Sequence, residues 1–199
     1  MENRIINLFL YENALRFSEI EKLSKIKSNK MAYHLKSLVK KGVIEKNGNL
    51  YKLSDSKEYL IPYLNKTKSV IPVVLVAIKN KKGIFLVERR KRPFKGKLGL
   101  PGGRLIMGET IKESVERIGK KFNVNCKFKK INSISMEFVK KNKNTIHSFL
   151  LIFATAETKE KIDFMDFEKN KRRIISSDCK LIKKDFLKEI KIPVLFSKA

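Results

Sequence analysis

Apolar residues are spaced differently in the two parts of the chain. In RIINLFLYEN, near the start, they recur at intervals that place them on one face of a helix. After about residue 67 they form longer runs, such as IPVVLVAI at 71–78 and IHSFLLIFATAE at 146–157, which are typical of strands. The sequence therefore predicts two domains, a mainly helical one at 1–67 and an α+β one at 68–199.

Length and composition fit two small globular domains. The 199 residues suffice for two cores, and 42% hydrophobic with 33% charged residues excludes a disordered chain. No apolar run approaches the roughly 20 residues of a membrane span, and no basic region precedes the apolar start. We therefore expect a cytoplasmic protein without a membrane contact. Cys126 and Cys179 form no CxxC pair, which argues against a zinc site or a disulfide framework.

Basic side chains outnumber acidic ones, 46 against 20, which gives a net charge of +26. Residues 1–67 carry 13 basic and 7 acidic side chains, a net charge of +6, and residues 68–199 hold the remaining +20. This surplus favours a polyanionic partner, such as nucleic acid or a phosphorylated ligand. Lysine dominates it, however, and a genome-wide bias in composition also produces lysine-rich surfaces, so charge alone does not identify the partner.

Three short helices are expected in the first domain. Ser18, with Glu21 three residues later, forms a capping box that opens the second helix. Ser28 can cap the third helix, and Gly42 ends it. The expected inner faces of these two helices consist of Ile20, Leu23 and Ile26, and of Met31, Leu35, Leu38 and Val39. Asn47 and Gly48 then give a two-residue hairpin turn between short strands, and 54–68 suggests a short helix and a polar joint.

Helices followed by a hairpin resemble a winged helix-turn-helix domain, and SNKMAYHLKSLVKKGVIEKNGNLYKLS is similar to that family's recognition helix and wing. This resemblance implies binding of duplex DNA, with the third helix in the major groove and the wing on the backbone. The candidate DNA-binding residues are Ser28, Asn29, Lys30, Tyr33, Lys36, Lys40, Lys41, Asn47 and Asn49. Asn29 is the candidate for reading a base edge, and the lysines for neutralising phosphates. The alternative is a solvated helix in a protein-interaction domain.

The second domain alternates predicted strands with helices. IPVVLVAI and GIFLVERR suggest two strands, and a helix is expected from about Thr110 to Phe122. VNCKFKKI, SISMEFV and IHSFLLIFATAE suggest three further strands, the last two joined as a hairpin by KKNKN. KKDFLKEI at 183–190 suggests a late helix.

The segment from VVLVAI to GLPGG, followed by Gly103, five residues, Glu109, seven residues and Arg117, resembles the Nudix family. The family's box continues after the arginine as glutamate, aliphatic, any residue, two glutamates, any residue, glycine and aliphatic. The resemblance implies an α/β/α sandwich with a mixed sheet, in which Gly103, Glu109 and Arg117 brace a loop, a helix and a second loop.

The acids that follow the arginine in that box are missing. Family members hold magnesium with glutamates after the arginine, but this chain has Ile118, Gly119, Lys120, Lys121 and Phe122 there. If Asn123 takes the left-handed position usually filled by glycine, Lys120 and Lys121 replace the paired glutamates. An ungapped alignment gives Lys121 and Phe122 instead. An ammonium group repels a divalent cation and attracts phosphate, so both alignments favour binding without hydrolysis.

The candidate residues for gripping phosphates are Arg89, Arg92, Arg104, Lys120 and Lys121. We expect a DNA-binding transcriptional regulator, acting as a homodimer, whose second domain senses a nucleotide or sugar nucleotide and needs no cofactor or metal. The alternative is an active Nudix pyrophosphohydrolase that uses Mg²⁺, with the first domain as an accessory. RNA binding by the second domain is a third possibility, although the sequence lacks an aromatic-rich RNA-recognition strand.

Overall fold

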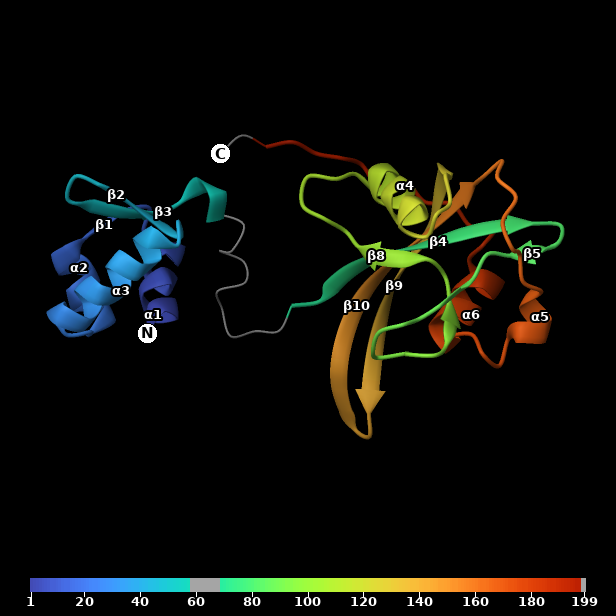
Figure 1. The fold of residues 1–199 in the computed structure, drawn as a ribbon, viewed down its shortest axis with the longest axis horizontal. Coiled ribbons are helices and arrows are strands. Elements are labelled where there is room, and N and C mark those ends of the chain that lie inside the picture. The colour runs from blue at the N-terminus through green and yellow to red at the C-terminus, as the bar shows by residue number, and fades with distance from the viewer. Residues whose placement is uncertain (58–68, 198–199) are drawn as a thin grey trace. The chain divides into compact units, whose positions relative to one another are not determined.

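The computed structural model describes residues 1–57 and 69–197. The chain divides into two compact units, Met1–Ser69 and Val70–Ala199 (Figure 1). The predicted boundary after residue 67 lies outside the described residues, and so does most of the short helix expected at 54–68.

The first unit combines helices with a small antiparallel sheet. In chain order its elements are α1 (Glu2–Ile6), the 3-10 helix η1 (Asn7–Leu10), β1 (Leu15–Arg16), α2 (Phe17–Ser24), α3 (Ser28–Lys40), β2 (Ile44–Asn47) and β3 (Leu50–Leu53). Strand β3 lies between β1 and β2 and pairs antiparallel with both. The centre of the core consists of Ile5, Ile20, Met31, Leu35, Leu38 and Ile44, none more than 1% exposed.

The predicted caps of α2 and α3 are wrong. Helix α2 begins at Phe17, and the Glu19 carboxylate accepts the Arg16 N–H at 2.6 Å, so the capping glutamate is not Glu21. Ser28 is the first residue of α3, and no side chain caps that helix. The Ser28 hydroxyl instead donates to the Glu21 carboxylate, which links the two helices.

Two apolar residues that the sequence pattern assigned to the inner faces of α2 and α3 are exposed, because the core of the first unit includes fewer positions than the pattern predicted. Leu23 is 52% exposed and Val39 is 38% exposed. The end of α3 is as predicted, since Gly42 is left-handed with φ +64° and its N–H donates to Val39. The hairpin turn is shifted by one residue: Asn47 pairs with Leu50, which leaves Gly48 and Asn49 as the turn.

Strands dominate the second unit. Its elements are β4 (Ile71–Asn80), β5 (Gly83–Ile84), β6 (Val87–Glu88), β7 (Leu98–Gly99), β8 (Gly102–Arg104), α4 (Ile111–Lys121), β9 (Lys127–Lys141), β10 (Asn144–Glu157), α5 (Phe167–Asn170) and α6 (Ser176–Lys184). The main sheet has the order β5-β4-β10-β9, with β8 paired to β4. Strands β4 and β10 are parallel, whereas β8, β9 and β5 pair antiparallel with their neighbours. The predicted mixed sheet in an α+β chain is confirmed.

Alternate residues of β4 define two faces of this sheet. Val74 and Val76 belong to the core under α4, together with Val115 and Ile118 of that helix. Leu75 and Ala77 belong to a second core under α6. One helix therefore covers each face, while the hairpin of β9 and β10 extends beyond the helices (Figure 1).

Three predicted elements of this unit need correction. GIFLVERR forms two short strands, because β5 pairs with β4 whereas β6 pairs with β7. VNCKFKKI and SISMEFV contribute to one long strand, β9, and Val124 and Cys126 precede it. The late helix is α6, which ends at Lys184, so most of KKDFLKEI follows it; Leu181 and Ile182 fix its position by packing on the sheet.

Membrane insertion by a helix is not supported. Within residues 1–57 and 69–197, no helix combines the length and the apolar character that crossing a bilayer requires.

Candidate functional site

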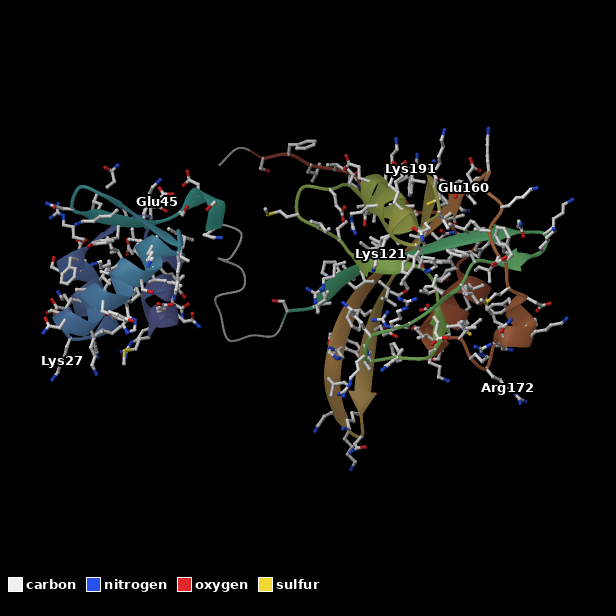
Figure 2. All side chains as sticks on the ribbon, viewed as in Figure 1. Lys27, Glu45, Lys121, Glu160, Arg172 and Lys191 are labelled. Atoms are coloured by element: carbon white, nitrogen blue, oxygen red, sulfur yellow. The ribbon has the colours of Figure 1, made fainter. Side chains whose placement is uncertain are left out.

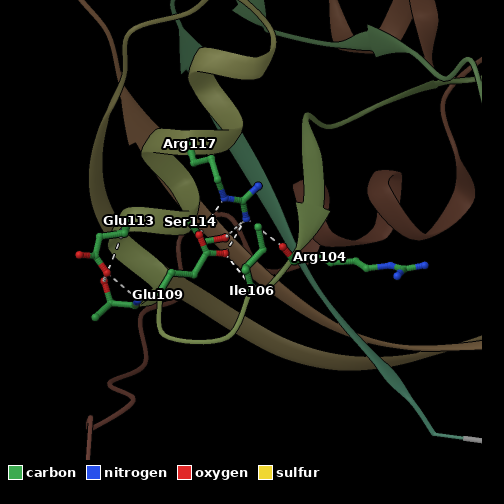
Figure 3. Close-up of polar contacts among 7 residues, drawn as sticks. Arg104, Ile106, Glu109, Glu113, Ser114 and Arg117 are labelled. Atoms are coloured by element: carbon green, nitrogen blue, oxygen red, sulfur yellow. Dashed lines mark hydrogen bonds and ion pairs between the residues drawn. The ribbon is translucent and has the colours of Figure 1, made fainter. Parts of the chain in front are cut away.

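A half-buried ion pair braces the loop before α4 (Figure 3). Arg117 donates from Nε to Glu109 Oε2 at 2.7 Å and from Nη2 to Glu109 Oε1 at 2.5 Å. The same Nη2 donates to the Arg104 carbonyl at 2.9 Å, and Glu109 also accepts the Ile106 N–H at 2.8 Å. The hydrogen bonds from Arg117 hold the pKa of Glu109 below its ordinary value, although burial opposes the shift. The pair therefore fastens β8 and its loop to the helix.

Helix α4 begins with a reciprocal cap. The Thr110 hydroxyl accepts the Glu113 N–H, and the Glu113 carboxylate accepts the Thr110 N–H at 2.7 Å. Both hydrogen bonds from Thr110 lower the pKa of Glu113. Glu113 is thus engaged in stabilising the first turn of the helix.

The end of α4 is compatible with both alignments to the Nudix box. Asn123 is left-handed with φ +57°, as the gapped alignment requires, and the Val124 N–H donates to Gly119 across the turn. Counting along the helix from the braced Arg117 instead gives Lys121 and Phe122. Lys121 is common to both counts, and its Nζ lies 5.0 Å from the centre of the Phe122 ring. Lys120 and Lys121 are both exposed.

Magnesium does not fit this end of α4. The ion prefers oxygen ligands such as carboxylates, but the residues from Ile118 to Asn123 include no acid. Ammonium groups at Lys120 and Lys121 only donate hydrogen bonds. In the described part of the chain, no three His, Cys, Asp or Glu side chains lie close enough together to hold a metal ion.

A small cavity, here called the central cavity, lies on the opposite face of the sheet. Its volume is about 30 Å³. Its lining consists of Val73, Leu75, Arg89, Phe94, Glu137, Phe149, Leu151, Ile175, Ser177 and Asp178. Among the described residues, the buried Nε of Arg89 has no hydrogen-bond partner. A buried polar atom of this kind is costly unless a ligand or water satisfies it, so the cavity is suited to a polar guest.

Asp178, in the first turn of α6, is the most perturbed acid of the cavity. It is 4% exposed, and its Oδ2 accepts the Leu100 N–H at 2.7 Å. Burial raises its pKa to about 7, and the nearby Glu137 carboxylate acts in the same direction. The Leu100 N–H and the Arg89 charge oppose this rise without cancelling it. Asp178 therefore changes protonation near neutral pH and can either donate or accept a hydrogen bond.

The five proposed phosphate-binding residues do not form one cluster. Arg89 lines the central cavity, whereas Lys120 and Lys121 lie on α4, which packs on the other face. Arg92 and Arg104 are exposed, and Arg104 ends β8 (Figure 3). Lys121 is labelled among the side chains of the second unit in Figure 2.

Sequence reasoning missed Asp178, Glu137 and Ser177 as cavity residues. One signal was present: SSD before Cys179, Leu181 and Ile182 is a helix start with an acidic first turn. Glu137 gave no local signal, because it is one of several charged residues on an alternating strand.

Helix α3 of the first unit carries a polar stripe. At 100° per residue, Asn29, Tyr33, Lys36 and Lys40 fall on one face, opposite the buried Met31, Leu35 and Leu38. All four are exposed, Tyr33 by 71%. We call these four residues the α3 stripe. It presents an amide, a phenol and two ammonium groups on one side of a helix whose other side packs in the core of the first unit.

The other candidate DNA-binding residues are placed differently. Ser28 donates to Glu21, and Lys41 forms an ion pair with Glu2 at 2.8 Å, so both are engaged within the unit. Lys30 is exposed beside the stripe. Asn47 and Asn49 are exposed at the tip of the hairpin.

Comparison with known proteins assigns a family model to part of the second unit. The family model described as the NUDIX domain matches residues 70–168, which confirms the resemblance based on Gly103, Glu109 and Arg117. No curated protein matches the chain.

Similar solved structures include a NUDIX hydrolase from Nitrosomonas europaea, with 16% identity over 58% of this chain and 87% of that one and a TM-score of 0.47. The NUDIX domain of Shewanella oneidensis NrtR complexed with ADP ribose is 16% identical over 66% and 96% of the two chains, with a TM-score of 0.47. The MutT protein from Methanosarcina mazei Go1 is 20% identical over 53% and 83%, with a TM-score of 0.43.

Proposed function

We propose that the chain is a DNA-binding transcriptional regulator in which the domain that matches the NUDIX model at residues 70–168 senses a nucleotide or sugar nucleotide without hydrolysing it. One observation carries the proposal: the bracing pair Glu109–Arg117 is intact, while lysines stand where the family has metal-binding acids. A fold that keeps its frame and loses its metal ligands is suited to binding rather than to catalysis.

Support for DNA binding comes from the first unit. Its order of elements, with α2 and α3 followed by the β2–β3 hairpin, is the order expected of a winged helix-turn-helix domain and so supports the proposal. In such a domain the α3 stripe would face the major groove, and its exposed amide and ammonium groups support this assignment. We propose that Asn29 reads a base edge, that Lys36 and Lys40 contact phosphates, and that the chain binds a two-fold symmetric site as a homodimer.

Support for a nucleotide effector comes from both faces of the second unit. The lining of the central cavity includes Asp178, Arg89 with its unpartnered Nε, and the aromatic residues Phe94 and Phe149. Such a set can hydrogen-bond and flank a planar heterocycle, although Phe94 or Phe149 must move to admit one. Lys120 and Lys121 are exposed cations on α4, and Arg104 is an exposed cation of β8 that pairs with Val73, a residue of the central cavity. All three are available to phosphate oxygens.

The first prediction follows from the absence of acids between Ile118 and Asn123. With Mg²⁺ or Mn²⁺, the chain should show no turnover of ADP-ribose, sugar nucleotides or nucleoside triphosphates above a blank without protein. Chromatographic assays of the products measure this, and binding of the same compounds by calorimetry establishes that they reach the protein.

The alternative of an active hydrolase would require displaced acids. Glu116 is the candidate, because Glu113 is occupied by the helix cap. Metal-dependent turnover that disappears in Glu116→Gln, but persists in Glu160→Gln of an exposed loop, would replace the sensor with an enzyme.

A further inference from the structure

A second and much larger cavity lies beside α6, outside the Nudix box and the central cavity. Its volume is about 610 Å³, within the range of roughly 300–1,000 Å³ that small-molecule sites occupy. We call it the α6 pocket. It shares only Phe94 and Ile175 with the lining of the central cavity, so a ligand here would contact a separate set of side chains.

Cations surround this pocket. They are Lys97, Lys171, Arg172, Lys180, Lys183 and Lys184. Lys171 and Lys183 share one carboxylate, Glu168, at 3.7 and 3.6 Å. Within residues 1–57 and 69–197, the other four form no ion pair, although Lys184 lies near Asp185, which itself pairs with Lys188. Grouped cations repel one another, so the site gains stability when an anion binds.

The floor of the pocket is apolar, in contrast to its rim. Phe94, Ile174, Ile175 and the half-buried Cys179 line it. Ser176, the first residue of α6, is also in the lining, and no side chain caps this helix in the described structure. The first N–H groups of the helix add to the positive potential at that point. A guest must therefore combine negative charge with an apolar body.

We propose that the α6 pocket binds a small organic phosphate whose apolar or aromatic portion contacts the Phe94 and Ile174 floor and whose phosphate is held by Arg172, Lys180 and Lys97. Lysines supply point charges that suit phosphate oxygens, and Arg172 adds paired donors. An inorganic anion would leave the apolar side chains of the floor exposed to solvent. A nucleic-acid duplex would meet only the rim, because a concave pocket of this size does not admit it.

Cys179 provides a reporter inside the pocket. Its thiol donates to the Lys171 carbonyl at 3.6 Å, and a ligand on the floor would cover it. In the full-length protein, the rate at which iodoacetamide alkylates Cys179 is measured by mass spectrometry, with the buried Cys126 as an internal reference. The probes are octyl phosphate and adenosine monophosphate, which distinguish an aliphatic from a nucleotide ligand, with octanol and adenosine as uncharged controls.

At least one of the two phosphates should slow alkylation of Cys179 about fivefold or more, whereas octanol and adenosine should not. The double variant Arg172→Ala, Lys180→Ala should lose this protection, and the matched variant Lys127→Ala, Lys159→Ala, which removes two exposed lysines outside the pocket, should keep it. The proposal is overturned if neither phosphate protects, if protection survives the first variant, or if only a 20-base-pair duplex protects.

Discussion

Asp178 shows how one side chain can connect ligand binding to pH. It is buried beneath the sheet, holds the Leu100 N–H, and lies near both Glu137 and Arg89. A carboxyl with its pKa raised to about 7 is neutral in part of the population at physiological pH. Perturbed acids of this kind concentrate at binding sites, and Asp178 lines the cavity in which we place the heterocycle of the effector.

The raised pKa of Asp178 predicts a pH-dependent stability. Because its folded value of about 7 exceeds the ordinary 3.8, the folded chain binds more protons than the unfolded chain between these values. The free energy of unfolding therefore falls as pH rises through this window. Asp178→Asn keeps an acceptor for Leu100 and removes the charge. Relative to wild type, the variant should gain about 2–3 kcal/mol between pH 5 and 8, measured by urea unfolding.

Asp163→Asn is the matched control for that experiment, because Asp163 is exposed on a loop. The free energy of unfolding of this control, plotted against pH, should run parallel to that of the wild type. If the Asp178→Asn curve runs parallel as well, the buried carboxyl does not titrate between pH 5 and 8, and the proposed role of Asp178 as a pH-sensitive group is wrong.

Among the elements, α4 and α6 show which features a sequence can predict. The bounds of α4 follow from local chemistry, since Thr110 caps its start and Asn123 takes the left-handed position after its end. The position of α6 depends on the packing of Leu181 and Ile182 against the sheet, which local pattern does not reveal. The brace of Glu109 and Arg117 was predicted from the resemblance to the Nudix box, whereas the burial of Asp178 depends on the packing of α6 and was not predicted.

Helix α3 carries the prediction for DNA binding. Substituting Asn29 by Ala should cost about 1–3 kcal/mol at the preferred operator and reduce discrimination at one base pair, if its amide contacts a base edge. Substituting Lys36 by Ala should weaken binding at every sequence and reduce the salt dependence by about one phosphate contact. Gel-shift titrations of the full-length protein at two salt concentrations measure both effects.

Lys41→Ala is the control, because it removes the same charge from a residue that directly follows α3, is paired with Glu2 and lies off the α3 stripe. It should leave the affinity for DNA nearly unchanged. Equal losses in Lys36→Ala and Lys41→Ala would indicate a general effect of charge, and no binding at low salt would exclude the DNA-binding proposal.

For the whole molecule, the proposal requires that the two units communicate. A ligand shifts an equilibrium only by the difference between its affinities for the two states. The effector must therefore bind the free and the operator-bound protein with different affinities. Typical coupling energies of about 1–3 kcal/mol correspond to roughly 5- to 150-fold changes in affinity.

Thermodynamic linkage requires that nucleotide and operator change each other's affinity for the protein by the same factor. If a nucleotide such as ADP-ribose changes operator affinity by a given factor, the operator must change nucleotide affinity by the same factor, and calorimetry with and without operator measures this. The double variant Lys120→Ala, Lys121→Ala should weaken the nucleotide several-fold and leave DNA affinity without nucleotide unchanged, because these lysines lie on α4 of the second unit. The Lys127→Ala, Lys159→Ala variant should bind both partners as wild type does. A nucleotide that binds tightly but equally in both states would leave the second unit without a sensory role.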